Sequence, residues 1–374
     1  MAIFDVPLEE LRRRRSIKWS RFEPDVLPMF VAEMDARLAE PIAEALTRSI
    51  ALSDSGYPEQ PDYQDAFIAY AADTWNWQID GADIKLAGDV MQGMRDVLAA
   101  VTEPGDHVVI NPPIYPPFRG ICKATGRQTL EVPLTEAGRL DLDGLAEAFS
   151  GARGVKPTAY LLCSPHNPNG TVHTLEELTA VARLAADHDV VVIADEIHAP
   201  LTPASHIPYL EVPGADNAYV VTSASKSWNL AAYKAGLIVA GPGARRVFNA
   251  LHPMVSECAS YAGIIAHTAA LNDARDWPLQ VADEVAQHKR LLADELSAQL
   301  GLTYEPSEGT YLAWVDCSPL GLDFPAKQFH EVGRVRFNLG TDFSLDAKQW
   351  VRINLAASPD VIREAVARMA RTFS

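Results

Sequence analysis

The sequence predicts an α/β protein with a mostly parallel central sheet in a large domain and a smaller α+β domain beside it. Short apolar runs alternate with helical patterns from about residue 84 to residue 240, which is typical of parallel strands joined by helices. The chain has 374 residues, 48% of them hydrophobic, which is too much for one small domain. We therefore expect a large domain over residues 40–275 and a small domain built from residues 1–39 and 276–374.

The apolar runs indicate where the strands of the sheet lie. They are rich in Val and Ile and nearly continuous, as expected for strands buried on both faces. The predicted strands are His107–Ile110, Tyr160–Cys163, Val190–Ala194, Tyr219–Thr222 and Gly236–Ala240.

Helical patterns fill the intervals and the C-terminal part of the chain. Thr174 and Glu177 have the spacing of a capping box, which gives the helix after them a defined start. The strand-like pieces Tyr304–Asp316 and Val335–Leu339 predict a second, smaller sheet. The predicted helices are Met91–Thr102, Leu175–Asp187, Trp277–Leu300 and Pro359–Phe373.

Composition argues against several classes of partner. The net charge of −17 repels phosphate backbones and anionic lipid surfaces, so we expect no nucleic acid and no membrane as partners. The short basic run Arg12–Arg15 is interpreted as a solvated face. No run of apolar residues approaches the length of a membrane span, and the N-terminus lacks the order of a secretory signal.

The cysteines and histidines predict neither disulfides nor a metal centre. The four cysteines are scattered without a CxxC pair, which in a chain of this size favours reduced thiols and a cytoplasmic location. Neither HExxH nor paired Cys/His spacing occurs, so no metal site is predicted.

Chemistry-bearing residues follow three successive predicted strands, where ligands gather in open parallel sheets. Asp195 ends the run Val191–Ala194; an acid after a buried strand needs a partner, which could be a cationic ring nitrogen, a metal ion or a helix start. Lys226 lies in a Ser-rich turn after the next run, either as an amine nucleophile or as a solvated surface lysine. Asn167 lies between Pro165 and Gly170, in a rigid turn or an ordinary loop.

The order of these three segments resembles that of fold type I pyridoxal 5′-phosphate (PLP) enzymes, the class I/II aminotransferase superfamily. Within that superfamily the chain is most similar to the MalY/PatB family of cystathionine β-lyases, and the resemblance covers nearly the whole chain. The segments that carry it are Lys18-Trp19, Pro28–Asp35, Gly56-Tyr57, Glu103–Asp106, Pro112–Phe118, Pro165–Gly170, Asp195–His198, Ser225–Asn229 and Val351–Leu355.

The resemblance implies PLP as cofactor and a role for each matching residue around its ring. Lys226 is expected to hold the cofactor as a Schiff base, and Asp195 to pair with the pyridinium nitrogen and keep the ring an electron sink. Asn167 should donate to the 3′ oxygen and Tyr115 should stack on the ring, although Tyr115 could also be a core tyrosine. His198 either lies near the 3′ oxygen or is a packed histidine.

The same resemblance assigns the phosphate and the substrate. Ser223, Lys234 and the backbone N–H groups of Val90 and Met91 match the phosphate-binding positions. Tyr57 matches a tyrosine that reaches the phosphate of the neighbouring subunit, which implies a homodimer with shared active sites. Arg352 matches the arginine that grips the substrate carboxylate, a task suited to a planar fork, and Ala32 and Asn167 are expected to contact the same substrate.

The chain departs from the family pattern at a few positions. The phosphate turn reads Asp89-Val-Met91 where the family usually has Gly-Val-Val, and an acid there would repel phosphate unless it points away. Glu33, Ala36 and Pro116 also differ from the usual residues, which affects the expected substrate preference more than the expected cofactor.

The function implied is a carbon–sulfur β-lyase that releases a thiol, pyruvate and ammonia from L-cystathionine or related cysteine S-conjugates. Two alternatives stay open at this point. The same residues serve a class I/II aminotransferase, and the scaffold also suits a regulatory or binding protein that has lost turnover.

Overall fold

The computed structural model describes residues 2–373, which divide into two compact units. The sheet unit consists of residues 38–165 and 172–277. The terminal unit consists of the described residues before 38 and after 277, together with the short segment 166–171. This segment lies inside the expected large domain in sequence, yet its contacts group it with the terminal unit.

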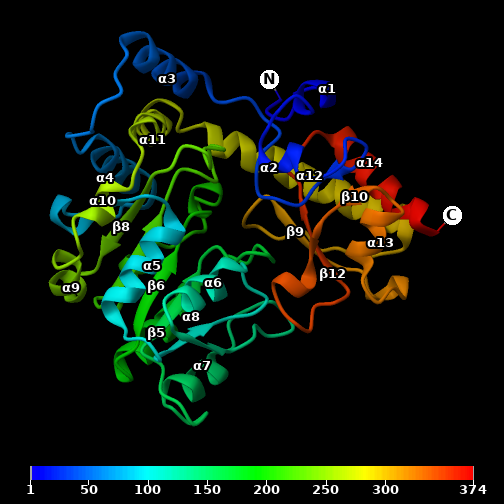
Figure 1. The fold of residues 1–374 in the computed structure, drawn as a ribbon. Helices are drawn as coiled ribbons and strands as arrows, with labels where there is room; N and C mark the ends of the chain where they lie inside the picture. The colour runs from blue at the N-terminus through cyan, green and yellow to red at the C-terminus, as the bar shows by residue number, and fades with distance from the viewer. Residues whose placement is uncertain (1, 374) are drawn as a thin grey trace. The chain divides into compact units, whose positions relative to one another are not determined.

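The sheet unit is built around a seven-stranded sheet in the order β2-β8-β7-β6-β5-β3-β4, with the described helices on both faces (Figure 1). The strands are β2 (Ile84–Ala87), β3 (His107–Ile110), β4 (Gln128–Glu131), β5 (Ala159–Cys163), β6 (Val191–Asp195), β7 (Ala218–Thr222) and β8 (Gly236–Ala240). The helices are α3 (Glu40–Leu52), α4 (Asp62–Trp75), α5 (Val90–Val101), α6 (Pro117–Ala124), α7 (Leu142–Phe149), α8 (Leu175–Asp187), α9 (Arg245–Asn249), α10 (Met254–Glu257) and α11 (Tyr261–Asp273).

The sheet is mostly parallel, as predicted, with two exceptions in strand pairing. Strands β4, β3, β5, β6 and β7 pair in parallel, whereas β8 pairs antiparallel with both β7 and β2. The physical reason lies in the connection between β7 and β8. Residues 223–235 form a series of turns without a helix, and a parallel return would need a crossover element.

The two faces of the sheet belong to two different apolar cores. Alternate residues of β5, such as Leu162 and Leu161, point into opposite cores, and both side chains are fully buried. Helices α4, α7, α8 and α11 contribute to one core, and α5 and α6 contribute to the other. Burial of each such side chain contributes about 1.5–3 kcal/mol, so the central strands are held firmly from both sides.

Register places the ends of three parallel strands level with one another. Cys163 at the end of β5 pairs with Asp195 at the end of β6, and Asp195 pairs in turn with Val221 of β7. The residues that follow β6 and β7 therefore leave the sheet at the same edge, which is where Asp195 and the turn with Lys226 lie.

The terminal unit has its own core and a small antiparallel sheet in the order β11-β12-β9. Its helices are α1 (Leu8–Leu11), α2 (Ile17–Ser20), α12 (Trp277–Leu300, whose first residue belongs to the sheet unit), α13 (Pro325–Glu331) and α14 (Pro359–Ala370). Its strands are β1 (Leu27–Pro28), β9 (Leu312–Asp316), β10 (Val335–Arg336), β11 (Asn338–Leu339) and β12 (Trp350–Asn354), and β1 pairs in parallel with β10.

Local predictions agree with the structure where side chains define the element ends. The capping box of Thr174 and Glu177 is present at the start of α8, and α12 spans the predicted residues. The expected strand from Tyr304 is too long, because β9 begins only at Leu312. In the preceding segment the carbonyls of Ser307 and Gly309 accept the buried Lys289 ammonium, at 2.7 and 3.0 Å, instead of pairing with a strand.

The expected strand Val335–Leu339 is divided into two short pieces with different partners, β10 beside β1 and β11 beside β12. In the described residues, no helix has both the length and the apolar content needed to cross a membrane.

Candidate active site

Asp195 ends β6 as a deeply buried carboxyl. Its side chain is 4% exposed, and its Oδ1 accepts the N–H of Ile197 at 3.1 Å. Burial raises the pKa of Asp195 to about 7, against the stabilising effects of the Ile197 N–H and the positive charge of Lys226. A carboxylate held in this way is stabilised by any cation that reaches it, so the position favours a positively charged ligand atom.

Lys226 lies in the turn that follows β7, near enough for its charge to lower the pKa of Asp195. Ser223, at the start of this turn, is 3% exposed and holds the turn through its side chain. The Ser223 hydroxyl donates to the carbonyl of Ala235 at 2.7 Å and accepts the N–H of Ser225 at 3.1 Å. The structure thus brings Asp195 and Lys226 together at one edge of the sheet.

The hydrogen bonds of Ser223 bear on its expected role at the phosphate. A serine hydroxyl has one proton to donate, and here the Ala235 carbonyl takes it. Ser223 therefore joins two parts of the turn by hydrogen bonds. Its hydroxyl would have to rotate away from the Ala235 carbonyl to donate to a phosphate.

The remaining phosphate candidates gather where α5 begins. Asp89 is the N-cap of α5, and its Oδ1 accepts the N–H of Gln92 at 2.8 Å. Its Oδ2 lies 2.7 Å from the Nζ of Lys234. Burial alone would raise the pKa of Asp89, but Lys234 and the Gln92 N–H hold it below its ordinary value. Val90 and Met91 follow directly, so the expected N–H donors and the expected lysine lie around one carboxylate.

Gly236 allows this close arrangement of β8 and the start of α5. A Cβ atom at Gly236 would lie 2.9 Å from the backbone carbon of Asp89 and 3.2 Å from the nitrogen of Val90. Any other residue would push the start of α5 away from the strand that follows Lys234.

The other candidates of the sheet unit differ in burial. Tyr115 is half-buried just before α6 and packs against the core that includes Phe118. His198 is 2% exposed, in the short turn after Asp195. Tyr57 lies in the connection between α3 and α4 and is fully exposed, at 102% of its reference area.

The terminal unit holds the candidate for carboxylate binding. Arg352 lies in the middle strand β12 and is 3% exposed. Its Nη1 donates to the Oδ1 of Asn167 at 2.9 Å, and its Nη2 donates to the Oδ1 of Asn338 at 2.8 Å. Its guanidinium carbon also lies 4.7 Å from the centre of the Phe343 ring. These contacts fix the plane of the guanidinium fork.

Asn167 is oriented by this contact with Arg352. Because its carbonyl oxygen faces the guanidinium, its amide nitrogen is the atom that can donate to a ligand oxygen. The turn that carries it is tightly packed: a Cβ at Gly170, where φ is +73°, would lie 2.5 Å from the Gly309 carbonyl oxygen. Glycine is needed there for both the backbone angle and the space.

Ala32 belongs to a segment held through its backbone. The Ala32 carbonyl accepts the hydroxyl of Tyr311 at 3.2 Å, and Asn354 donates to the carbonyls of Val31 and Glu33, each at 2.7 Å. The Glu33 carboxylate accepts the Ser16 hydroxyl at 2.5 Å. The segment around Ala32 is therefore held in place by hydrogen bonds within the terminal unit.

Sequence reasoning did not find several of these supporting residues. Asn338 gave no signal because its role follows from its register opposite Arg352 across β11 and β12. Asn354 could have been noticed, since it lies two residues after Arg352 in the same strand.

Glu196, directly after Asp195, is a further residue whose role the sequence pattern did not indicate. Its buried carboxylate lies 3.1 Å from the Nε2 of His206 and accepts the N–H of Tyr209 at 2.7 Å.

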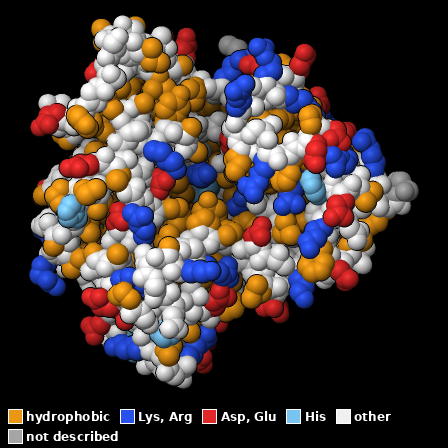
Figure 2. Space-filling model, in the orientation of Figure 1, with side chains coloured by type: hydrophobic (Ala, Val, Ile, Leu, Met, Phe, Trp, Pro, Cys, Tyr) orange, Lys and Arg blue, Asp and Glu red, His pale blue; other side chains and the backbone are white. Residues whose placement is uncertain are grey.

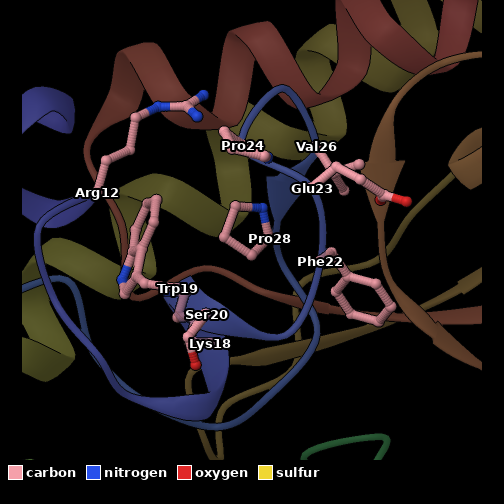
Figure 3. Close-up of a pocket in the computed structure, with 9 residues that line it drawn as sticks. All are labelled: Arg12, Lys18, Trp19, Ser20, Phe22, Glu23, Pro24, Val26 and Pro28. Atoms are coloured by element: carbon pink, nitrogen blue, oxygen red, sulfur yellow. The ribbon is translucent and has the colours of Figure 1, made fainter.

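One surface pocket of about 210 Å³ lies in the terminal unit and is separate from these residues (Figure 3). Trp19, Pro24 and Pro28 form part of its wall, and none of the predicted site residues lines it. In residues 2–373 no group of three or more His, Cys, Asp and Glu side chains is arranged to hold a metal ion.

Comparison with known proteins identifies the family. The family described as aminotransferase class I and II matches residues 40–369. The chain belongs to this family. It is 40% identical over 388 residues to a Mycobacterium leprae protein provisionally named a cystathionine beta-lyase, covering 98% of this chain and 96% of that protein. It is 28% identical to the cystathionine beta-lyase PatB of Bacillus subtilis, with 98% of each chain covered.

Solved structures confirm the fold type and the cofactor. Cystalysin from Treponema denticola, whose crystal structure contains pyridoxal 5′-phosphate, matches with a TM-score of 0.91 at 25% identity, covering 99% of each chain. The family member described here is therefore a PLP-dependent enzyme of fold type I, similar to the MalY/PatB cystathionine β-lyases, as the sequence motifs indicated.

The residues of the sheet unit fit this cofactor on chemical grounds. A pyridinium N–H is a cation that would stabilise the buried carboxylate of Asp195, whose pKa is raised without one. Lys226 supplies an amine at the same edge. Lys234 and the first N–H groups of α5 supply the positive potential that a phosphate needs, although Asp89 opposes part of it.

Proposed function

We propose that this enzyme is a carbon–sulfur β-lyase that converts L-cystathionine or a related cysteine S-conjugate to a thiol, pyruvate and ammonia. The observation that carries the proposal is the similarity to cystathionine β-lyases along nearly the whole chain, at 40% and 28% identity. The positions of Lys226, Asp195 and Arg352 support it, because each lies in a setting suited to the role that the family assigns to it.

When bound, PLP supplies an electron sink that makes the α-proton of an amino acid acidic. In our proposal Lys226 would hold the cofactor through its amine, and the same amine would serve as the general base that takes the α-proton. Asp195 keeps the ring nitrogen protonated. The family resemblance would give Asn167 and His198 roles at the ring 3′ oxygen and Tyr115 a role at the ring face.

Arg352 would grip the substrate carboxylate with its preset guanidinium fork, while Ala32 borders the substrate in a segment already ordered by Asn354. The carboxylate contact would restrict the orientation of the substrate. Loss of that proton and of the β-carbon–sulfur bond releases the thiol, and water then yields pyruvate and ammonia.

For the phosphate we propose the N–H groups of Val90 and Met91, Lys234 and the hydroxyl of Ser223 as ligands. The hydroxyl must leave the Ala235 carbonyl to serve, and Lys234 must share its charge between the phosphate and Asp89. The proposed phosphate site therefore includes a negative charge, Asp89, beside its positive groups.

A homodimer with shared active sites is part of the proposal. Tyr57 is fully exposed, and Ile50 and Leu52 of the preceding helix α3 are each 78% exposed. Figure 2 shows hydrophobic side chains on the surface near α3. Exposed apolar side chains next to a fully exposed tyrosine are what a subunit interface would bury, and Tyr57 could then reach the partner's phosphate.

The four cysteines form no disulfide with one another in the described residues, and three of them are buried. This supports a cytoplasmic location, where thiols stay reduced.

The deciding experiment incubates the purified holoenzyme with L-cystathionine in the absence of any 2-oxo acid. We expect stoichiometric pyruvate and free thiol, and no product from the Lys226→Ala variant. Product that forms only when a 2-oxo acid is supplied would overturn the lyase in favour of an aminotransferase. A visible cofactor band without turnover on any cysteine conjugate or amino acid would instead indicate a binding protein.

A further inference from the structure

A set of buried polar side chains is hydrogen-bonded to the turn that carries Lys226. Tyr63 of α4 and His267 of α11 are both 0% exposed, and Ser223 at the start of the turn is 3% exposed. Helices α4 and α11 pack against each other in the sheet unit (Figure 1). Buried polar groups of this kind are costly unless hydrogen-bonded, so their partners reveal what they hold.

The proton positions follow from the acceptors. The Nε2 of His267 lies 2.9 Å from the carbonyl of Tyr233, which can only accept, so Nε2 carries the ring proton. Burial lowers the pKa of His267 to about 4, against the effect of its carbonyl partners, so the ring is neutral at physiological pH. Nδ1 is therefore an acceptor.

The acceptor on His267 sets the direction of the next bond. The hydroxyl of Tyr63 lies 3.1 Å from Nδ1 and donates to it. The oxygen of Tyr63 then accepts the N–H of Ala224 at 3.3 Å. The two rings also meet edge to face, with their centres 5.1 Å apart. A one-way chain of hydrogen bonds thus runs from the Ala224 backbone through Tyr63 to His267.

The two residues that precede Lys226 are both fixed by this arrangement. Ala224 is held by Tyr63, and Ser225 donates to the Ser223 hydroxyl at 3.1 Å. Tyr63 and His267 come from helices outside the turn, so they fix it relative to the sheet rather than only within itself. Neither side chain carries a charge at neutral pH, so their influence on Lys226 is geometric.

We propose that Tyr63 and His267 are positioning residues that fix the amine of Lys226 relative to Asp195. This inference rests on the proposed function of Lys226 as the cofactor-binding amine. It adds to the site two residues that act through the backbone of Ala224.

The test compares Tyr63→Phe with Tyr219→Phe. Both remove one buried hydroxyl, but that of Tyr219 donates to the carbonyl of Ala244 at 3.2 Å, away from the turn. We expect Tyr63→Phe to shift the pH midpoint of the visible cofactor band by about half a unit or more, and to lower kcat about tenfold with little change in KM. Tyr219→Phe should change neither, even if it lowers the melting temperature.

A second pair of variants covers the case in which Tyr63→Phe does not fold. His267→Asn keeps an amide oxygen that can accept from Tyr63, whereas His267→Leu has no acceptor. We expect the asparagine variant to retain the parental midpoint more closely than the leucine variant. Equal midpoints in the parent, His267→Leu and any folded Tyr63→Phe would overturn the proposal.

The midpoint is measured without substrate, so it separates this inference from the proposed reaction. A parent enzyme that shows the band but no lyase activity would refute only the proposed reaction, and the comparison of midpoints would still decide the role of Tyr63 and His267.

Discussion

Replacing Asp195 by asparagine should stabilise the apoenzyme while weakening cofactor binding. The carboxyl is fully enclosed, and its burial raises its pKa from 3.8 to about 7. A proton is then bound more tightly in the folded state than in the unfolded state. Asp195 therefore favours folding below pH 3.8, and this contribution is lost as the pH rises towards 7.

The size of the effect follows from the two pKa values. Linkage gives a cost of about 1.7 kcal/mol at pH 5 and about 4 kcal/mol at pH 8, a difference of about 2.5 kcal/mol. Asparagine does not ionise, so this pH-dependent part should vanish in Asp195→Asn. The free energy of unfolding of the variant, relative to the parent, should rise by about 2.5 kcal/mol between pH 5 and pH 8.

The assay is urea unfolding of the cofactor-free enzyme at both pH values and at one protein concentration. The matched control is Asp141→Asn, which changes an acid that accepts the Gly144 N–H at the start of α7. A relative stability of Asp195→Asn that stays constant from pH 5 to pH 8 would refute the reasoning. With cofactor present the order should reverse, because loss of a buried charge partner costs about 3–5 kcal/mol, at least about 100-fold in PLP affinity.

Three further predictions concern the phosphate, the substrate and the dimer. Asp89→Asn keeps the α5 cap but frees Lys234 from an ion pair that is partly exposed and therefore worth only about 0.5–1 kcal/mol. Fluorescence titration should show that this variant binds PLP about 2- to 5-fold more tightly than the parent, while Asp141→Asn binds it as the parent does. Unchanged or weaker PLP binding by Asp89→Asn would contradict this prediction. Arg352→Lys loses a buried guanidinium fork, so the KM for L-cystathionine should rise about 10- to 100-fold in steady-state kinetics with the cofactor band intact; an unchanged KM would exclude the carboxylate role. Tyr57→Phe should weaken PLP binding about 5-fold or more without changing monomer folding, and sedimentation of the parent as a monomer would exclude the shared site.

The strongest sequence signals came from segments whose chemistry is local. Continuous Val and Ile runs predicted the central strands because both faces of those strands are buried, and Thr174 with Glu177 predicted the start of α8 because a cap involves only neighbouring residues. Strand β4 gave no such signal: it lies at the sheet edge, none of its residues is buried, and its sequence Gln128–Glu131 is largely polar.

The candidate site was predictable to the extent that it follows strand ends. Asp195 ends β6 and Lys226 lies in the turn after β7, and because these two strands are adjacent and parallel, both residues lie at one edge of the sheet. The partners of those residues were not predictable in the same way. The bond between Asn338 and Arg352 depends on the register of two strands, and that of Asp89 with Lys234 joins residues far apart in the chain.

The sequence by itself therefore determined the fold class, the family and the residues that bear the chemistry, because these depend on local pattern and on motif order. Tertiary structure alone decided the antiparallel return of β8, the partner of each polar side chain and the direction of the hydrogen bonds from Ala224 to His267. The physical reason is that a hydrogen bond requires its donor and acceptor within about 3 Å. Residues such as Tyr63 and His267 come that close only after the helices that carry them have packed.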